Sequence, residues 1–254
     1  MLPFRSTFVC ESERLEMPRS KSPFFRFKQF VVWHNRSALK VCTEACILGA
    51  YVDVAHCGNI LDIGTGTGIL ALMAAQRAQN AQIEAVELNT DAAQQARENV
   101  ELSPFGARIA VHQMAVQDFW PPQLFDLIVC NPPFFSNHLR SPQIARNLAL
   151  HTQTLSFEDL AEAGARLLGQ DGRFVVLLPK YETALFEKAA LQKGFFQTRQ
   201  LVVFQRINAP IFRIVTTFQK ANVPFVSENL YIHQTDGAYS EAFRGLLQDY
   251  YLDF

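Results

Sequence analysis

Apolar residues along this chain recur with two different periods, and the period changes several times between residues 43 and 218. Short continuous apolar runs, typical of buried strands, occupy residues 59–63, 83–88, 108–112, 125–130 and 172–178. Runs with helical spacing alternate with them over residues 43–54, 69–77, 90–100, 156–168 and 181–193. This alternation predicts an α/β fold in which a mostly parallel sheet carries helices on both faces.

Two further strand-like runs, residues 201–204 and 212–218, follow the last of these helices. They predict an antiparallel hairpin, which completes a seven-stranded sheet whose last strand is antiparallel. The tail from Tyr239 to Phe254 has amphipathic spacing, so we expect a C-terminal helix that docks on the domain. Near the start of the domain, Thr43 is the expected N-cap of the first helix.

The N-terminal region differs from the rest. Residues 1–26 show no helical or strand period and contain Pro3, Pro18 and Pro23. We therefore expect a basic, loosely ordered arm over residues 1–26, followed by one domain over residues 27–254. Between Phe24 and Trp33 aromatic and basic residues are interleaved, a pattern that suits an added strand, a surface on which bases stack, or core packing.

The composition limits the class of protein. The chain has 254 residues, of which 49% are hydrophobic, enough for one well-packed α/β domain. It contains neither an apolar run of bilayer length nor an uninterrupted signal-peptide core, so we expect a cytoplasmic location and no membrane partner. The irregularly spaced cysteines are typical of reduced thiols, and no metal is expected because Cys42, Cys46, His56 and Cys57 match no common zinc spacing.

Charge is segregated along the chain although its formal net value is only −1. No acidic residue occurs in the intervals 17–43, 127–157 and 188–227, all of which contain basic residues. Such segregation favours a basic face that meets a polyanion, although ordinary solvated charge is the alternative. Five residues of the first two intervals are the candidates for contacts with the phosphates of such a polyanion: Arg26, Lys28, Lys40, Arg140 and Arg146.

A glycine-rich turn follows the first predicted strand of the sheet and reads Gly64-Thr65-Gly66-Thr67-Gly68. Strand, glycine turn and helix together open a nucleotide-binding unit. The dinucleotide pattern requires its third glycine at position 69, where this chain has Ile69, so a small cofactor without phosphates fits better. Glu87 ends the next strand 87 − 64 = 23 positions after the first glycine, near the spacing at which a carboxylate meets ribose hydroxyls.

The fourth predicted strand ends abruptly in Asn131-Pro132-Pro133-Phe134. The two prolines lack backbone N–H groups, so the strand cannot continue and the turn is stiff. The turn frees the Asn131 amide and a backbone carbonyl, and Phe134 adds a flat apolar face. These groups suit a planar ligand with an NH2 group, such as a nucleobase or a carboxamide; a simple proline-terminated strand is the other interpretation.

These residues resemble two known motifs. Asp62–Gly68 is similar to motif I of class I S-adenosylmethionine-dependent methyltransferases, and Asn131–Phe134 resembles the (D/N)PP(Y/F/W) motif of amino-group methyltransferases. Phe27–Phe30, Lys40 to Glu44 and Asp249–Leu252 further resemble the bacterial family that methylates N6 of adenine 37 in a valine tRNA.

The resemblance implies a Rossmann-like methyltransferase fold, S-adenosylmethionine as cofactor, and the anticodon loop of tRNA(Val) as substrate. It departs from the family at Cys42-Thr43-Glu44, where Gly-Thr-Asp is usual. It also departs near Ala115, where an expected acid is missing and Asp118 is the candidate substitute. The implied cofactor-binding residues are Thr43, Asp62, Gly64, Gly66, Gly68, Glu87, Asp118 and Asn131.

The sequence also suggests a mechanism. Asn131 and the Pro132 carbonyl are expected to accept hydrogen bonds from the adenine amine, while Pro133 stiffens the turn and Phe134 stacks on the flipped base. Three other functions use the same motifs: a ribosomal RNA adenine or guanine methyltransferase, a protein glutamine methyltransferase, and a non-enzymatic, cofactor-binding RNA chaperone.

Overall fold

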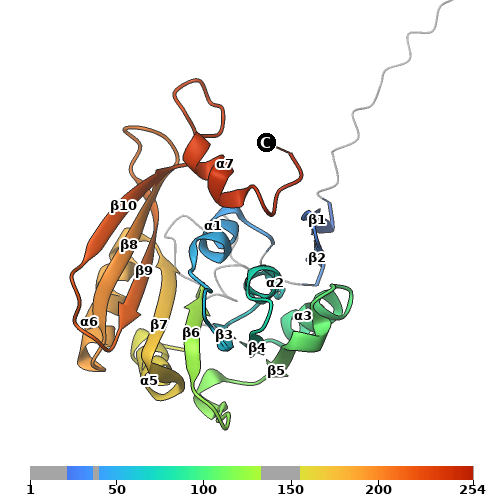
Figure 1. Ribbon diagram of the computed structural model, residues 1–254, viewed down its shortest axis with the longest axis vertical. Helices are drawn as coiled ribbons and strands as arrows, with labels where there is room; N and C mark the ends of the chain where they lie inside the picture. The colour runs from blue at the N-terminus through green and yellow to red at the C-terminus, as the bar shows by residue number, and fades with distance from the viewer. Residues whose placement is uncertain (1–21, 37–39, 133–154, 254) are drawn as a thin grey trace, which may run out of the picture.

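The computed structural model describes residues 22–36, 40–132 and 155–253, and its centre is an eight-stranded sheet (Figure 1). The strand order is β10-β8-β9-β7-β6-β3-β4-β5. β9 runs antiparallel to both of its neighbours, and every other neighbouring pair is parallel. The strands are β3 (Asn59–Ile63), β4 (Gln82–Glu87), β5 (Ile109–Gln113), β6 (Phe125–Cys130), β7 (Leu168–Leu178), β8 (Phe196–Phe204), β9 (Ile211–Gln219) and β10 (Val226–Tyr231).

The predicted class is confirmed, with one strand more than the seven expected. The additional strand is β10, which pairs with β8 in parallel at the edge of the sheet. Its sequence Val-Ser-Glu-Asn-Leu-Tyr leaves four residues exposed, so it lacks the apolar pattern that marks a buried strand. The antiparallel strand is therefore β9, the last but one in chain order.

Helices cover both faces of the sheet (Figure 1). Two separate hydrophobic clusters show this division: Ile60 of β3 belongs to the cluster that includes α1 and α2, whereas the next residue, Leu61, packs with α5 and α6. Alternate residues of one buried strand thus serve opposite layers. The helices are α1 (Thr43–Tyr51), α2 (Ile69–Arg77), α3 (Thr90–Glu101), α5 (Phe157–Leu167), α6 (Lys180–Gln192) and α7 (Glu241–Leu247), with 3-10 turns η1 (Gly106–Arg108) and η2 (Val116–Asp118).

The first helix begins one residue earlier than expected. Cys42 is the N-cap, with an extended backbone, because the Cys46 N–H already donates to the Cys42 carbonyl at 3.2 Å. The prediction that Thr43 caps the helix is therefore wrong, and Thr43 is its first residue. By contrast, the capping box predicted at the start of α5 is present, with Ser156 and Asp159 bonded to each other's backbone.

The two ends of the described chain pack against each other. A hairpin of β1 (Phe24–Arg26) and β2 (Val31–Trp33) buries Phe27 and Phe30, whose rings stack with centroids 4.6 Å apart. Core packing is thus the role of these two aromatics. Residues 1–21 lie outside the described part of the chain, so the loosely ordered arm stays a prediction there, while its last three residues form β1.

The C-terminal segment closes over this hairpin, although its helix α7 covers only Glu241–Leu247 and the contacts come from the residues after it. Lys28 donates from its backbone N–H to the Tyr250 carbonyl at 2.8 Å and from Nζ to the Gln248 carbonyl at 2.5 Å. The buried Tyr250 hydroxyl donates to the Met73 carbonyl of α2 at 2.9 Å. The tail therefore fixes the hairpin to the helix that follows the glycine turn.

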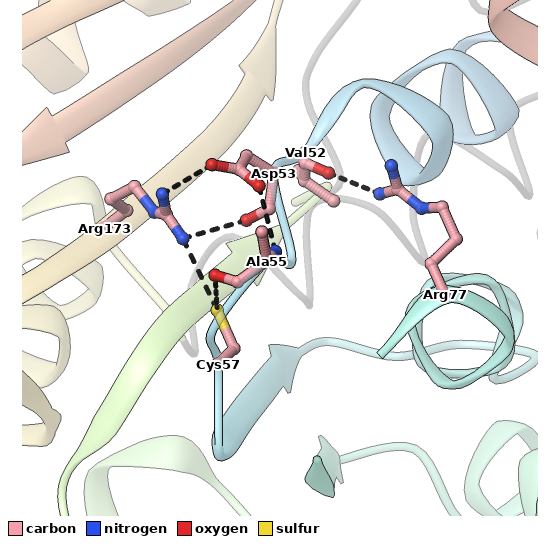
Figure 2. A network of polar contacts seen from close by, with 6 residues as sticks. All are labelled: Val52, Asp53, Ala55, Cys57, Arg77 and Arg173. Atoms are coloured by element: carbon pink, nitrogen blue, oxygen red, sulfur yellow. Dashed lines mark hydrogen bonds and ion pairs between the residues drawn. The ribbon is translucent and has the colours of Figure 1, made fainter. Parts of the chain in front are cut away.

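A polar network holds the segment that connects α1 to β3 (Figure 2). Arg173 in the middle of β7 donates to Asp53 Oδ2 at 2.8 Å, to the Asp53 carbonyl at 3.1 Å and to Cys57 Sγ at 3.5 Å. Arg77 of α2 donates to the Val52 carbonyl and, at 3.0 Å, to that of Gly49. These bonds tie the connection between α1 and β3 to two neighbouring elements.

No helix in the described residues combines the length and apolar character needed to cross a bilayer.

Candidate active site

The register of three neighbouring strands brings the main candidate residues to one edge of the sheet. Ile63, the last residue of β3, is aligned with Val86 of β4 and with Cys130 of β6. All three strands are parallel, so the residues that follow leave the sheet at the same edge. Gly64, Glu87 and Asn131 are therefore brought together, in the crevice where open α/β sheets bind ligands.

The glycine turn requires glycine for its backbone. Gly64, Gly66 and Gly68 have φ values of +71°, +58° and +83°, a region that side chains disfavour. A Cβ atom on Gly64 or Gly66 would meet no atom within 4 Å, whereas one on Gly68 would approach Ala96 at 3.5 Å. The first two glycines therefore border open space, and the third packs against α3.

Glu87 holds the turn from the neighbouring strand. Its carboxylate is buried, with Oε2 accepting the Gly66 N–H at 2.9 Å and Oε1 accepting the Asn89 N–H at 2.8 Å. Each oxygen keeps a second lone pair that can accept a hydroxyl group. Glu87 therefore links the turn to the start of α3, where Asn89 rather than the expected Thr90 or Asp91 is the N-cap.

Asp62 lies beneath the turn and is fully buried. Its Oδ2 accepts Thr65 Oγ1–H at 2.5 Å and the Ala71 N–H at 3.2 Å, while Oδ1 has no hydrogen-bond partner among the described residues. Burial raises the pKa of this carboxyl to about 7, with the nearby negative charge of Glu87 as a smaller cause. The site thus contains a buried acceptor that suits a positively charged or N–H-bearing ligand.

Asn131 supplies a second unpaired acceptor. It is half-buried directly after β6, and its Oδ1 is inaccessible to solvent and has no hydrogen-bond partner in the described part. Pro132 is buried beside it, whereas Pro133 and Phe134 lie outside the described residues. Burial, followed by the charges of Asp62 and Glu87, raises the pKa of the Cys130 thiol well above its usual range, so Cys130 is no nucleophile.

Two expected cofactor residues are not joined to the turn by any hydrogen bond that the structure describes. Asp118 is exposed in η2, beyond the carboxyl end of β5. Thr43 is half-buried in the first turn of α1, where its neighbour Glu44 accepts a 3.0 Å hydrogen bond from Arg213 of β9. The candidate substitution of Asp118 for the missing acid near Ala115 therefore stays a prediction.

The proposed basic face is only partly described. Arg26, Lys28 and Lys40 are exposed, whereas Arg140 and Arg146 lie outside the described residues. Lys28 has a structural role already, because its ammonium group binds the Gln248 carbonyl at the end of α7. A sequence pattern cannot separate such a tethered lysine from one that is free to contact phosphate.

One residue of the site was not predicted. Asn99 of α3 is fully buried; its Oδ1 accepts the Trp33 N–H at 2.9 Å, and its Nδ2 donates to the carbonyls of Trp33 at 2.9 Å and Thr67 at 2.8 Å. It therefore joins hairpin β1–β2 to the glycine turn. The sequence carried a signal, since Gln95 and Asn99 share the helical face of Ala92 and Ala96, where an apolar residue is expected.

Metal ligands do not gather in the described residues, which contain no group of three His, Cys, Asp or Glu side chains suited to an ion. Cys42 is the N-cap of α1 and Cys46 lies within the helix. Burial raises the pKa of the Cys42 thiol to about 11 and that of the Cys46 thiol to about 12. Both therefore stay protonated and pack as small apolar side chains.

Comparison with known proteins adds the family. Residues 37–201 match the family described as methyltransferase small domain. A protein of Dyadobacter fermentans named tRNA1(Val) (adenine(37)-N6)-methyltransferase is 45% identical over 94% of this chain and 100% of its own length. One of the same name from Phocaeicola vulgatus is 41% identical over 91% of this chain and 99% of its length. The crystal structure of a predicted O-methyltransferase from Agrobacterium tumefaciens shares the fold, with a TM-score of 0.65 and 21% identity over 81% of this chain and 95% of that one.

Proposed function

Because this chain belongs to the family of tRNA1(Val) (adenine(37)-N6)-methyltransferases, we propose that it methylates N6 of adenine 37 in the anticodon loop of a valine tRNA. It is an S-adenosylmethionine-dependent methyltransferase with a tRNA substrate. The observation that carries the proposal is the common edge of Gly64, Glu87 and Asn131, because it puts the Asn131 amide beside the glycine turn. We further propose that it acts in the cytoplasm, where tRNA is modified.

The residues present fit the cofactor. Open space beside Gly64 and Gly66 leaves room for a ligand against the backbone, and Glu87 keeps lone pairs for the ribose hydroxyls. The unpaired Asp62 Oδ1 is a buried acceptor that suits the ammonium group or another donor. When bound, S-adenosylmethionine supplies a methyl group on a positively charged sulfur, and the protein must then position an amine.

That positioning is the task of the Asn-Pro-Pro-Phe turn. The Asn131 Oδ1 and the Pro132 carbonyl accept hydrogen bonds from the two N–H groups of the adenine amine, which favours a pyramidal nitrogen with its lone pair localised. The same two oxygens stabilise the positive charge that develops on that nitrogen. Pro133 holds the turn rigid, and Phe134 stacks on the flipped base. The product ammonium is acidic, so it loses its proton without a dedicated base.

The substrate is tested by supplying radiolabelled cofactor together with separate pools of tRNA, ribosomal RNA and protein, followed by nucleoside and amino-acid analysis. We expect label as N6-methyladenosine in tRNA, and none when a valine tRNA transcript carries guanine in place of adenine 37. Label in ribosomal RNA or in glutamine would replace the proposed substrate by one of the alternatives. Binding of the cofactor without transfer to any pool would favour the chaperone.

The role of Asn131 is tested by Asn131→Ala. Loss of one oriented hydrogen-bonding group at a developing charge typically costs about 10²–10³-fold in kcat, while the glycine turn and Glu87 should keep cofactor affinity nearly unchanged. The matched control is Asn229→Ala, which truncates an exposed asparagine on edge strand β10. Turnover of the Asn131 variant at the level of this control would refute the assignment.

A further inference from the structure

A groove of about 580 Å³ lies at the same edge of the sheet as the candidate site. Its walls are the loop that joins β8 to β9 and the loop that joins β10 to α7, which Figure 1 shows close together. β8 and β10 run parallel to β6, so their carboxyl ends open at the edge where Asn131 lies. The lining residues that matter here are Gln205, Arg206, Phe212, Arg213, His233 and Gln234.

Backbone bonds hold the two walls together. The Ile232 N–H donates to the Phe204 carbonyl at 2.9 Å, and the His233 N–H donates to the Gln205 carbonyl at 3.0 Å. The His233 imidazole stacks on Tyr239, with ring centroids 5.1 Å apart and planes 22° apart. The groove is therefore a built feature of the fold, because it is closed by continuous backbone pairing beyond the end of the sheet.

The lining has the chemistry of a nucleotide site. Arg206 is exposed, and no described carboxylate pairs with it, so its guanidinium can meet a phosphate. Arg213 lies deeper, paired with Glu44 at 3.0 Å and with its guanidinium 4.5 Å from the centre of the Phe212 ring. The carboxamides of Gln205 and Gln234 are both donors and acceptors, the groups that read base edges.

We propose that this groove binds a nucleotide of the anticodon loop that flanks the methylated adenine. The inference rests on the proposed tRNA substrate and deepens it. The volume lies within the range of about 300–1,000 Å³ that is usual for small-molecule sites. β9, β8 and β10 are two, three and four strands from β6, so at ~4.8 Å per strand the groove lies on the order of 10–20 Å from Asn131 along the edge.

The position explains what a second subsite contributes. An enzyme that takes one base out of its stack loses the stacking that fixed the neighbouring nucleotides. A groove with a phosphate-binding guanidinium and base-reading amides holds one of those neighbours, and thereby sets which base reaches Asn131. The pair Arg213–Glu44 connects the groove to the first turn of α1, which also carries Thr43. Asp236, an acid of the loop that joins β10 to α7, accepts the Ala238 N–H of its own loop at 2.9 Å.

Crosslinking tests the location. The probe is a synthetic anticodon stem-loop of tRNA(Val) with 4-thiouridine in the position just before or just after adenine 37, irradiated on the full-length protein and analysed by peptide mass spectrometry. We expect adducts within residues 205–213 or 232–240. Adducts confined to other peptides, from a protein that does methylate the RNA, would overturn the groove and leave the proposed function intact. A wild-type protein that labels no RNA would reject the proposed function, and the groove proposal with it.

Variants test the contribution of the groove. Arg206→Ala should raise KM for the RNA by about tenfold, the loss typical of one hydrogen bond to a charged group, with kcat and the KM for S-adenosylmethionine unchanged. It should also reduce the slope of the logarithm of the RNA binding constant against the logarithm of the salt concentration by about one. The matched control is Lys188→Ala, which removes an exposed charge from α6. An unchanged RNA KM in the Arg206 variant, or an equal rise in the control, would refute the proposal.

Discussion

Asp62→Asn tests whether the glycine turn is built over a buried negative charge that destabilises the free protein. The Asp62 Oδ2 accepts hydrogen bonds from Thr65 and Ala71, and an asparagine oxygen can accept both. The new amide group takes the place of the unpaired Oδ1, so the variant keeps the volume and both bonds. The principal change is therefore the removal of the charge.

The magnitude follows from the pKa of Asp62, which burial raises from 3.8 to about 7. Between these values the folded protein binds the proton more tightly than the unfolded chain does, so stability falls as the pH rises from about 4 to about 7. The difference corresponds to about 4 kcal/mol at pH 8. A buried amide without a partner costs about 1–3 kcal/mol at either pH, so the variant should be more stable than the wild type by about 1–3 kcal/mol at pH 8 and less stable by about 1–3 kcal/mol at pH 4.

Urea unfolding of both proteins without ligand, at pH 4 and at pH 8, measures this change. Other titrating groups contribute equally to both proteins, so the difference between the two free energies of unfolding isolates Asp62. The expected signature is a difference that grows with pH in favour of the variant. A variant that is less stable than the wild type by the same amount at both pH values would show that the buried Asp62 charge does not destabilise the folded protein.

Three further substitutions test packing, capping and the turn. Gly164→Ala should cost about 1–3 kcal/mol in urea unfolding, because its Cβ would lie 2.6 Å from a ring carbon of the buried Phe174; an unchanged midpoint would mean that α5 can shift. Ser156→Ala should cost about 1 kcal/mol, because it removes the oxygen that accepts the Asp159 N–H, and a neutral result would make the capping box dispensable. Gly66→Ala should cost about 1–2 kcal/mol through its left-handed backbone and should also weaken S-adenosylmethionine binding in calorimetry, because the new methyl enters the open space; equal affinity would place the cofactor elsewhere.

The sequence predicted those parts of the fold that depend on local pattern. The bounds of β3 and α2 are those predicted, because a buried apolar run, a glycine turn and a helical run follow one another without ambiguity. β10 was missed because it is held by backbone pairing to β8 and exposes most of its side chains, which leaves no period to detect. The helix cap at Cys42 likewise depends on backbone geometry, which the residue type does not reveal.

The meeting of Gly64, Glu87 and Asn131 at one edge of the sheet was predictable from the order of the strands and turns. Parallel strands bring their carboxyl ends together, so a glycine turn, an acid and an Asn-Pro-Pro turn after neighbouring strands must converge. What each polar group does there was not predictable. Asp62 binds Thr65, three residues further on, and Glu87 and Lys28 bind partners 21 and 220 residues away. The residue types alone do not reveal any of these partners.

The two terminal motifs that resemble the family, at Phe27–Phe30 and at Asp249–Leu252, lie far from the glycine turn in sequence but contact it through packing. Tyr250 binds the Met73 carbonyl in the helix that follows the turn, and Asn99 joins Trp33 of the hairpin to the Thr67 carbonyl within the turn. An asparagine amide that pairs with both backbone groups of Trp33 behaves as an additional peptide unit of the hairpin. Because the Asn99 carboxamide is fully buried, loss of either backbone partner would leave one of its polar atoms unsatisfied. The ends of the chain therefore brace the turn, and their motifs are explained by the geometry of the site they support.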